Sequence, residues 1–324
     1  MGGHEYTLPV RFLFVMDPFA GMLPDKDTSF AFMRAAIARG HQVLHCRPEQ
    51  LFSEGAHVGV VARPLVVSNT APHFDAGEPR RERLKDIEAV FIRKDPPFDA
   101  SYLYTTQLLD LAKSHTLIIN DPTAVRDANE KLYALGFSEF MPPTLVSADE
   151  KQLIEFVSQV GGRAVIKPLD GAGGSGVAVL GADDVNLKPL VGLLTNEGRR
   201  LAMVQEFQPA VVQGDKRVLL LDGQVLGTIR RVPSGGDIRA NIHVGGRVEA
   251  TDLSAEERAM VEAVGARLRK VGLWFVGLDV INGKLIEINV TSPTGIQELG
   301  RLTNSVPEDR VIGWVEQRAA GMRA

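Results

Sequence analysis

The feature that most constrains this chain is a pair of apolar-rich segments near its C-terminal end, residues 274–281 and 285–290. They flank an Asn-Gly-Lys sequence at residues 282–284. Glycine readily adopts the left-handed backbone conformation that tight hairpin loops require, so we predict two antiparallel strands joined by a short loop. With a three-residue loop in which glycine takes the left-handed position, Asp279 lies opposite Glu287.

Strand alternation favours this three-residue loop. A two-residue Asn-Gly turn would place Leu278 opposite Glu287 and mix apolar with polar side chains on both faces. In the three-residue register one face is wholly apolar and carries Leu278, Val280, Ile286, Ile288 and Val290. The other face carries Asp279, Glu287 and Asn289, whose oxygen atoms suit Mg²⁺. A solvated hairpin face is the alternative, but the flanking segments are too apolar for a typical surface hairpin.

A second candidate site is the glycine-rich loop that follows Lys167. Gly171, Gly173, Gly174 and Gly176 fall between two predicted strands, so backbone N–H groups there can approach a phosphate closely. No Gly-Lys-Ser/Thr leads into a helix and a strand follows the loop, which excludes the P-loop and dinucleotide motifs. A flexible connection is the alternative. Lys167 argues against it, because a buried lysine is costly unless an anion pairs with it.

Four further segments are weaker candidates. Residues 203–207 end a strand with polar groups that could border a nucleotide base, although an ordinary strand end is the simpler interpretation. Residues 234–247 combine paired glycines with cations and predict a lid, with a solvated loop as the alternative. Residues 93–99 follow an apolar strand at the edge where open α/β sheets bind ligands. Residues 291–295 open a helix and offer hydroxyls and amides to a carboxylate or phosphate.

The order of predicted elements indicates an α/β protein of three parts. We predict an N-terminal open α/β domain over residues 1–125 and a central subdomain with the glycine-rich loop over residues 126–202. The C-terminal subdomain, residues 203–324, contains the hairpin and a flexible loop at 232–247. The polar stretch from Ala71 to Arg83 is predicted to be an exposed connection.

Composition excludes several classes of protein. The net charge of -4 gives no general attraction to nucleic acid or to an anionic membrane. No apolar stretch approaches the ~20 residues that span a bilayer, and residues 1–9 lack the pattern of a signal peptide. The single cysteine, Cys46, excludes an internal disulfide and is expected to be a buried thiol. We therefore expect a cytoplasmic protein.

Together, Lys131, Lys167, the glycine-rich loop and the Asp279 to Asn289 hairpin resemble the ATP-grasp ligase superfamily. The match sharpens to the bacterial-type glutathione synthetase family through Met16-Asp17-Pro18, residues 93–99, Asn129 to Leu132 and Glu287 to Thr294. It extends from about residue 11 to residue 298. The resemblance implies an ATP-grasp fold, preceded by the open α/β domain, and an ATP-dependent carbon–nitrogen ligase. Such a ligase joins γ-glutamylcysteine to glycine through an acyl phosphate, with release of ADP and phosphate.

The resemblance also implies roles for individual residues. Those expected to contact ATP are Lys131, Lys167, Gly171, Gly173, Gly174, Gln205, Glu206, Gln208 and Asp215. Those expected to hold two Mg²⁺ ions, with Mn²⁺ as an alternative, are Asp279, Glu287 and Asn289. Those expected to face the transferring phosphoryl group are Arg217, Arg231 and Arg239. Those expected to bind the peptide substrate are Arg93, Asn289, Ser292 and Thr294.

Two alternatives share much of this pattern: a related ATP-grasp ligase with another acceptor, and an ATP-binding regulator without turnover. The first should alter residues 93–99 and 291–295, and the second should lose a metal carboxylate or a lid arginine; none of these changes is present. A homo-oligomer, dimer or tetramer, is expected from the family. His243 in the lid and the tail after Glu298 depart from the family pattern. Asp279→Asn and Glu287→Gln are expected to abolish turnover with little effect on folding.

Overall fold

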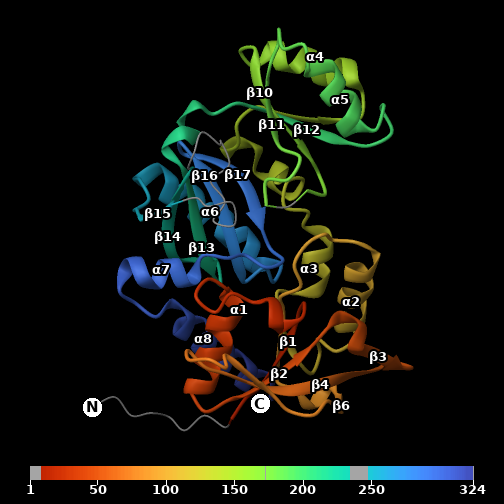
Figure 1. The fold of residues 1–324 in the computed structure, drawn as a ribbon, viewed down its shortest axis with the longest axis vertical. Coiled ribbons are helices and arrows are strands. Elements are labelled where there is room, and N and C mark those ends of the chain that lie inside the picture. Colours follow the sequence, from red (N-terminus) through yellow and green to blue (C-terminus); the bar gives the residue numbers. More distant parts are fainter. Residues whose placement is uncertain (1–8, 172, 234–246, 324) are drawn as a thin grey trace.

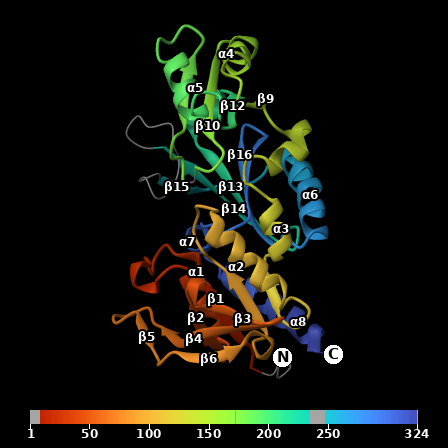
Figure 2. The same ribbon diagram turned by 90° about the vertical axis from the view of Figure 1, so that its right-hand side faces the viewer.

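The computed structural model describes residues 9–171, 173–233 and 247–323. Three parts are stacked along its long axis: an N-terminal domain, a C-terminal sheet in the middle and a small central subdomain at the far end (Figures 1 and 2). Helices and sheets alternate in the mixed α/β arrangement that the sequence predicts. In the described ranges no helix combines the length and apolar character needed to cross a membrane.

The N-terminal domain is built on a sheet with the strand order β3-β4-β2-β1-β7-β8, and both β5 and β6 pair with β4. Strands β2, β1, β7 and β8 are parallel neighbours, as expected for an open α/β domain. The strands are β1 (Arg11–Val15), β2 (Gln42–Cys46), β3 (Leu51–Glu54), β4 (His57–Val67), β5 (Phe74–Ala76), β6 (Arg80–Arg83), β7 (Ala89–Ile92) and β8 (Leu117–Ile119). The helices are α1 (Thr28–Ala38), α2 (Ala100–Asp110) and α3 (Pro122–Asp127).

The stretch from Ala71 to Arg83 is mostly exposed, as predicted, but it contains strands and is not only a connection. The expected exposed connection from Ala71 to Arg83 contains β5 and β6, which pair with the eleven-residue strand β4. The β6 side chains are mostly exposed arginines, so neither hydrophobic alternation nor propensity marks this strand. Backbone pairing with β4, a tertiary interaction, makes it a strand.

The central subdomain has a separate four-stranded antiparallel sheet with the order β11-β10-β12-β9. Two helices pack on this sheet and enclose a small core of their own. The elements are β9 (Thr144–Ser147), α4 (Glu150–Gln159), β10 (Arg163–Pro168), β11 (Ala178–Gly181), α5 (Leu187–Thr195) and β12 (Ala202–Glu206). The predicted division between residues 202 and 203 runs through β12, and the three-part division of the chain stays a proposal.

The C-terminal sheet has the order β15-β14-β13-β16-β17 and is antiparallel throughout. Asp222 and Gly223 form the hairpin turn between β13 and β14, and both have positive φ. Ser254 and Glu257 form a capping box at the start of α6. The elements are β13 (Asp215–Leu221), β14 (Gln224–Val232), β15 (Arg247–Ala250), α6 (Ala255–Lys270), β16 (Phe275–Ile281), β17 (Lys284–Asn289), α7 (Ile296–Thr303) and α8 (Pro307–Arg323).

The loop of the β16–β17 hairpin is shorter than predicted. Ile281 pairs with Lys284, so Asn282 and Gly283 form a two-residue turn with φ values of 50° and 74°. The three-residue loop was wrong because Asn282 also adopts the left-handed conformation, which suits the Asn-Gly two-residue turn. A β-bulge between the turn and the site inserts one unpaired residue, Ile286, into β17.

The bulge restores the predicted pairing of Asp279 with Glu287. It also exchanges two apolar residues between the faces of the hairpin. Leu285 is fully buried in the core, the place predicted for Ile286, whereas Ile286 is half-buried and faces the site. Asp279, Glu287 and Asn289 still share one face, because the bulge residue shifts the register of β17 as the third loop residue would have done.

One continuous hydrophobic core joins the N-terminal domain to the C-terminal sheet. It contains Val15 and Ile118 from the first sheet together with Leu278 and Ile288 from the hairpin. Helix α8 lies beside α1 (Figure 1), and its residues Val311, Ile312 and Val315 share a second core with the α1 helix. Cys46 is buried as predicted, and burial raises the pKa of its thiol above the ordinary value.

Candidate active site

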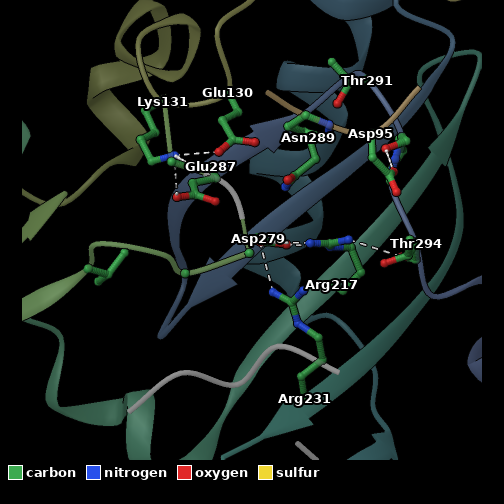
Figure 3. Close-up of a pocket in the computed structure, with 17 residues that line it drawn as sticks. Asp95, Glu130, Lys131, Arg217, Arg231, Asp279, Glu287, Asn289, Thr291 and Thr294 are labelled. Atoms are coloured by element: carbon green, nitrogen blue, oxygen red, sulfur yellow. Dashed lines mark hydrogen bonds and ion pairs between the residues drawn. The ribbon is translucent and has the colours of Figure 1, made fainter. Parts of the chain in front are cut away.

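A cavity of about 410 Å³ lies where the N-terminal domain, the glycine-rich loop and the C-terminal sheet meet. We call it the junction cavity (Figure 3). Its walls come from the hairpin, the glycine-rich loop and the segments 93–99 and 291–295, all marked by the sequence. Its lining residues are Asp95, Pro96, Glu130, Lys131, Gly171, Gly173, Gly174, Val177, Arg217, Arg231, Asp279, Glu287, Asn289, Thr291, Ser292, Pro293 and Thr294.

The β16–β17 hairpin presents its polar face to this cavity. Asp279 and Glu287 are cross-strand neighbours, and Asn289 pairs with Gly277 one position further along the same face. The Asn289 Nδ2 donates to the Gly277 carbonyl at 3.3 Å, so a fixed amide lies beside the two carboxylates. The predicted gathering of three oxygen-bearing side chains is therefore observed (Figure 3).

Arg217 on β13 and Arg231 on β14 both form ion pairs with Asp279. Arg217 donates from Nε to Oδ1 at 2.6 Å and from Nη2 to Oδ2 at 3.1 Å, and Arg231 lies 3.0 Å from Oδ2. Arg231 also pairs with Asp215. Burial raises the pKa of the Asp279 carboxyl, but the charges of Arg217 and Arg231 outweigh burial and hold that pKa below its usual range. Asp279 is therefore a carboxylate.

Two lysines approach the same region from the central subdomain. The Lys131 Nζ donates to Glu130 at 2.5 Å and to the Gly171 carbonyl at 2.6 Å, and it lies 3.8 Å from Glu287. Burial lowers its pKa, but the Glu287 and Glu130 charges outweigh burial and raise the pKa above normal. Lys167 is buried and donates to the Gln205 amide oxygen at 2.9 Å. Burial lowers the Lys167 pKa, so a cation there needs an anionic partner.

A smaller cavity of about 140 Å³, which we call the adjoining slot, continues from the junction cavity. The two share Gly174, Val177, Arg231, Asp279 and Glu287. The rest of the slot has apolar walls and a polar edge, an arrangement that suits a flat aromatic base. Its apolar walls are Val165, Phe207, Val211, Ile281 and Ile286, and its polar edge is Lys167, Gln205, Glu206, Gln208 and Asp215.

The loop of residues 291–295 closes the other side of the junction cavity and is held from two directions. Arg217 donates to the Thr294 carbonyl at 3.2 Å, and Arg93 donates to the Pro293 carbonyl at 3.1 Å. Ser292 donates its hydroxyl to Asp95 at 2.7 Å. Arg93 is buried, also bonds Ser29 and lines neither cavity. Its contacts support the loop from behind, whereas the sequence predicted direct contact with a peptide substrate.

Apart from Arg93, the predicted site residues in the described part of the chain line one or both cavities. Arg239 and His243 lie outside the described residues. Several lining residues were given no site role from the sequence, among them Asp95, Glu130 and Ile286. Asp95 and Glu130 lie within segments already marked, and the signal for Ile286 was hidden because the bulge cannot be read from alternation.

The two parts of the chain match two models of one protein family. The N-terminal domain of prokaryotic glutathione synthetase matches residues 10–126, and the ATP-grasp domain of the same enzyme matches residues 130–304. The chain belongs to the prokaryotic glutathione synthetase family. It is therefore an ATP-dependent ligase.

Relatives of full length agree with this family. The glutathione synthetase of Thermosynechococcus vestitus is 40% identical over 313 residues, which cover 93% of this chain and 98% of the relative. That of Parasynechococcus marenigrum is 43% identical over 304 residues, 94% of this chain and 98% of the relative. Among solved structures, D-cycloserine synthetase DcsG superposes with a TM-score of 0.66 at 18% identity, covering 95% of this chain and 99% of its own. This last likeness shows the ATP-grasp fold.

The residues on the hairpin fit a divalent cation of the hard type that this family implies. Two carboxylates and an amide oxygen are the donors that Mg²⁺ prefers, with substrate phosphates completing its shell. Asp279 Oδ2 meets both arginines, whereas Oδ1 accepts from Arg217 alone among the described residues, so Oδ1 keeps a lone pair for a metal. Within the described ranges no three His, Cys, Asp or Glu side chains form a metal group, so the Asn289 amide matters to the fit.

Proposed function

We propose that the chain joins γ-glutamylcysteine to glycine in the junction cavity, with ATP bound across the adjoining slot. This proposal rests on one observation, that three features expected to bind ATP, metal and substrate line the same connected cavities. The polar face of the hairpin, the lysines beside the glycine-rich loop and the loop of residues 291–295 line connected cavities. A phosphate chain, a metal and a carboxylate substrate each have suitable partners there.

The slot supports a place for the nucleotide. Its apolar walls match a planar base, and Gln205, Glu206 and Gln208 offer amide and carboxylate groups along one edge. Asp215 lies at the end nearer the hairpin, on the strand β13, and we propose that it contacts the ribose. Lys131 and Lys167 would then contact phosphates covered by Gly171, Gly173 and Gly174.

The cations of the junction cavity support a phosphoryl transfer. In the proposed reaction the cysteinyl carboxylate attacks the γ-phosphorus of ATP, which gives an acyl phosphate and ADP; the glycine amine then attacks the acyl carbon and phosphate leaves. In the loose transition state, negative charge is spread over the three equatorial oxygens of the transferred group and develops on the leaving oxygen of ADP. The guanidinium groups of Arg217 and Arg231 are fixed by Asp279 and Asp215, so they can stabilise this charge without reorganising. Arg239 is proposed to join them.

The metal site rests on the same hairpin. We propose that Asp279, Glu287 and Asn289 hold two Mg²⁺ ions, which Mn²⁺ can replace. When bound, such ions neutralise charge on the phosphates and align them for transfer. Ser292 and Thr294 are proposed to contact the peptide substrate. We also propose a cytoplasmic location and a homo-oligomer, dimer or tetramer.

The test is phosphate release by the purified protein with ATP and Mg²⁺. Release should require γ-glutamylcysteine and glycine together, and the product should have the mass of the tripeptide. Equal release with other amine acceptors would favour a related ligase with a different acceptor. No release with any acceptor, despite ATP binding, would favour a regulator without turnover.

A further inference from the structure

Asp95 is an acidic residue of the junction cavity that forms no ion pair with a described residue, although its charge acts on the buried Arg93 guanidinium. Its Oδ1 accepts the Ser292 hydroxyl at 2.7 Å, and its backbone N–H donates to Asp17 Oδ2 at 3.0 Å. The nearby Lys94 does not neutralise this carboxylate. Its Nζ lies 3.3 Å from Asp17 Oδ1 and donates to the Asp95 backbone carbonyl at 2.9 Å.

The other acids of the cavity are compensated by cations. Asp279 has Arg217 and Arg231. Glu130 has Lys131 at 2.5 Å, and Glu287 has the same ammonium at 3.8 Å. Of the four acids that line this cavity, Asp95 is the one outside these ion pairs within the described residues, while Glu130 and Glu287 share one ammonium. Figure 3 shows Asp95 and Thr294 on one side of the cavity and Lys131, Glu130 and Glu287 on the opposite side.

This polarity determines how a donor peptide would lie. Its reacting carboxylate has to meet the phosphoryl group near Asp279, Arg217 and Lys131. A γ-glutamyl donor carries its ammonium group on the glutamyl residue, which is the end remote from that carboxylate. Extended from Asp279 toward the loop of residues 291–295, the donor brings this ammonium to the wall that carries Asp95 and Ser292.

We infer that Asp95 binds the ammonium group of the donor peptide and selects donors that carry one. This inference rests on the proposed function. The Ser292 hydroxyl occupies Oδ1, which leaves Oδ2 to accept a charge-assisted hydrogen bond. The Asp17 and Lys94 contacts hold the backbone at this position, so the carboxylate is aimed before the substrate arrives.

The acceptor glycine does not fit this place. Its nitrogen has to react as a free amine, whereas a carboxylate stabilises the charged ammonium form. It also has to reach the acyl carbon near Asp279, which lies between the wall that carries Asp95 and the side that carries Lys131 (Figure 3).

The test compares two donors in the wild type and in Asp95→Asn. One donor is γ-glutamylcysteine, and the other is glutarylcysteine, which differs only by lacking the amino group. With saturating ATP and glycine, Asp95→Asn should raise the KM for γ-glutamylcysteine about ten- to hundredfold. The KM for glutarylcysteine should change by less than about twofold, because that donor has no ammonium to lose. The KM for ATP should stay as in the wild type.

An equal effect on both donors, or no effect on either, would overturn the inference and leave the proposed function intact. Absence of wild-type turnover with γ-glutamylcysteine would overturn both. Direct titration calorimetry of the two donors, with circular dichroism of the variant, separates loss of binding from loss of folding. Glu78→Gln is the matched control: it removes the same charge from an exposed position of the N-terminal domain and should change neither KM.

Discussion

Asp279 is a structural partner as well as a proposed metal ligand. Its carboxylate is buried between Arg217 and Arg231, two guanidinium groups that belong to different strands. Loss of its charge would leave both arginines buried with one partner fewer, which is costly because an uncompensated buried charge is poorly solvated. Glu287 is half-buried, and the cation nearest to it, Lys131, has Glu130 as a closer partner. The two acids therefore differ in what they do for folding.

We expect Asp279→Asn and Glu287→Gln to reduce kcat by at least about a hundredfold each, because both lose a proposed metal ligand. Only Asp279→Asn should also lower the free energy of unfolding, by about 3 kcal/mol, since it breaks a buried ion-pair network. This revises the expectation from sequence that both variants spare folding. Urea unfolding and steady-state phosphate release check the two effects separately. Equal stability of the two variants would contradict the ion-pair argument.

The Asp279 carboxyl should also make stability depend on pH. Although burial acts to raise its pKa, Arg217 and Arg231 hold that pKa below its usual value in the folded protein. The unfolded chain then takes up the proton more readily, so the contribution of this group is fully present above about pH 4 and is lost as the pH falls toward the folded pKa. Unfolding measured between roughly pH 5 and pH 2.5 should show a steeper loss in the wild type than in Asp279→Asn. If the unfolding free energies of the wild type and Asp279→Asn fell in parallel with pH, the Asp279 carboxyl would not cause the pH dependence.

At the scale of elements, the position of the β16–β17 hairpin depends on one side chain from outside it. Asn120 follows β8, and its Nδ2 donates to the carbonyls of Phe275 and Val290 at 2.8 Å each. Its Oδ1 accepts from the backbone N–H groups of Trp274 and Phe275, also at 2.8 Å. The buried amide thus holds the start of one strand and the end of the other against the N-terminal domain.

Asn120→Asp keeps the shape of the side chain but points an oxygen at two carbonyl oxygens. We expect the free energy of unfolding to fall by about 2–4 kcal/mol, because two donors are lost in a buried place. The kcat should also fall, since Asp279 and Glu287 move with the hairpin. Asn186→Asp is the control, because that exposed side chain makes no hydrogen bond to a described residue. A loss of stability with normal kcat in the folded fraction would limit Asn120 to a structural role.

At the scale of the molecule, the C-terminal helix α8 packs against the N-terminal domain. Helix α8 packs on α1, and Glu316 accepts from Arg39 at 2.7 Å and 2.6 Å and bonds the buried His41. Glu308 pairs with Arg34 at 2.6 Å. The N-terminal domain and the C-terminal sheet therefore share one core and an ion-paired helix, whereas the central subdomain encloses its own core.

Glu316→Gln should weaken the attachment of α8, because Arg39 and His41 lose a charged partner in a largely buried place. We expect a loss of about 1–3 kcal/mol in the free energy of unfolding. The kcat of the folded protein should not change, since α8 lines neither the junction cavity nor the adjoining slot. Glu54→Gln, which removes an exposed partner of Arg81, should leave both quantities unaltered. Denaturant unfolding and phosphate release provide the measurements.

Much of this protein could be predicted from its sequence, because hydrophobic period, caps and turn residues act locally. Such signals predicted the open α/β arrangement of the N-terminal domain and the C-terminal hairpin with its polar face. The family motifs predicted which residues meet in the cavities. The strand β6 was missed because exposed arginines give no local sign of pairing.

The β16–β17 hairpin shows what the sequence could predict and what only the tertiary structure decided. The sequence predicted that Asp279 and Glu287 share a face, because their pairing places an apolar face on the other side, and this pairing is confirmed. Only the tertiary structure decided how this pairing arises. The turn contains two residues, Asn282 and Gly283, and the extra residue is the bulge at Ile286. The tertiary structure also decided the positions of two other residues. Arg93 lies behind the loop of residues 291–295, and Asp95 lies on the wall of the junction cavity. Contacts between segments far apart in the chain leave no periodic trace, so packing alone assigns these positions.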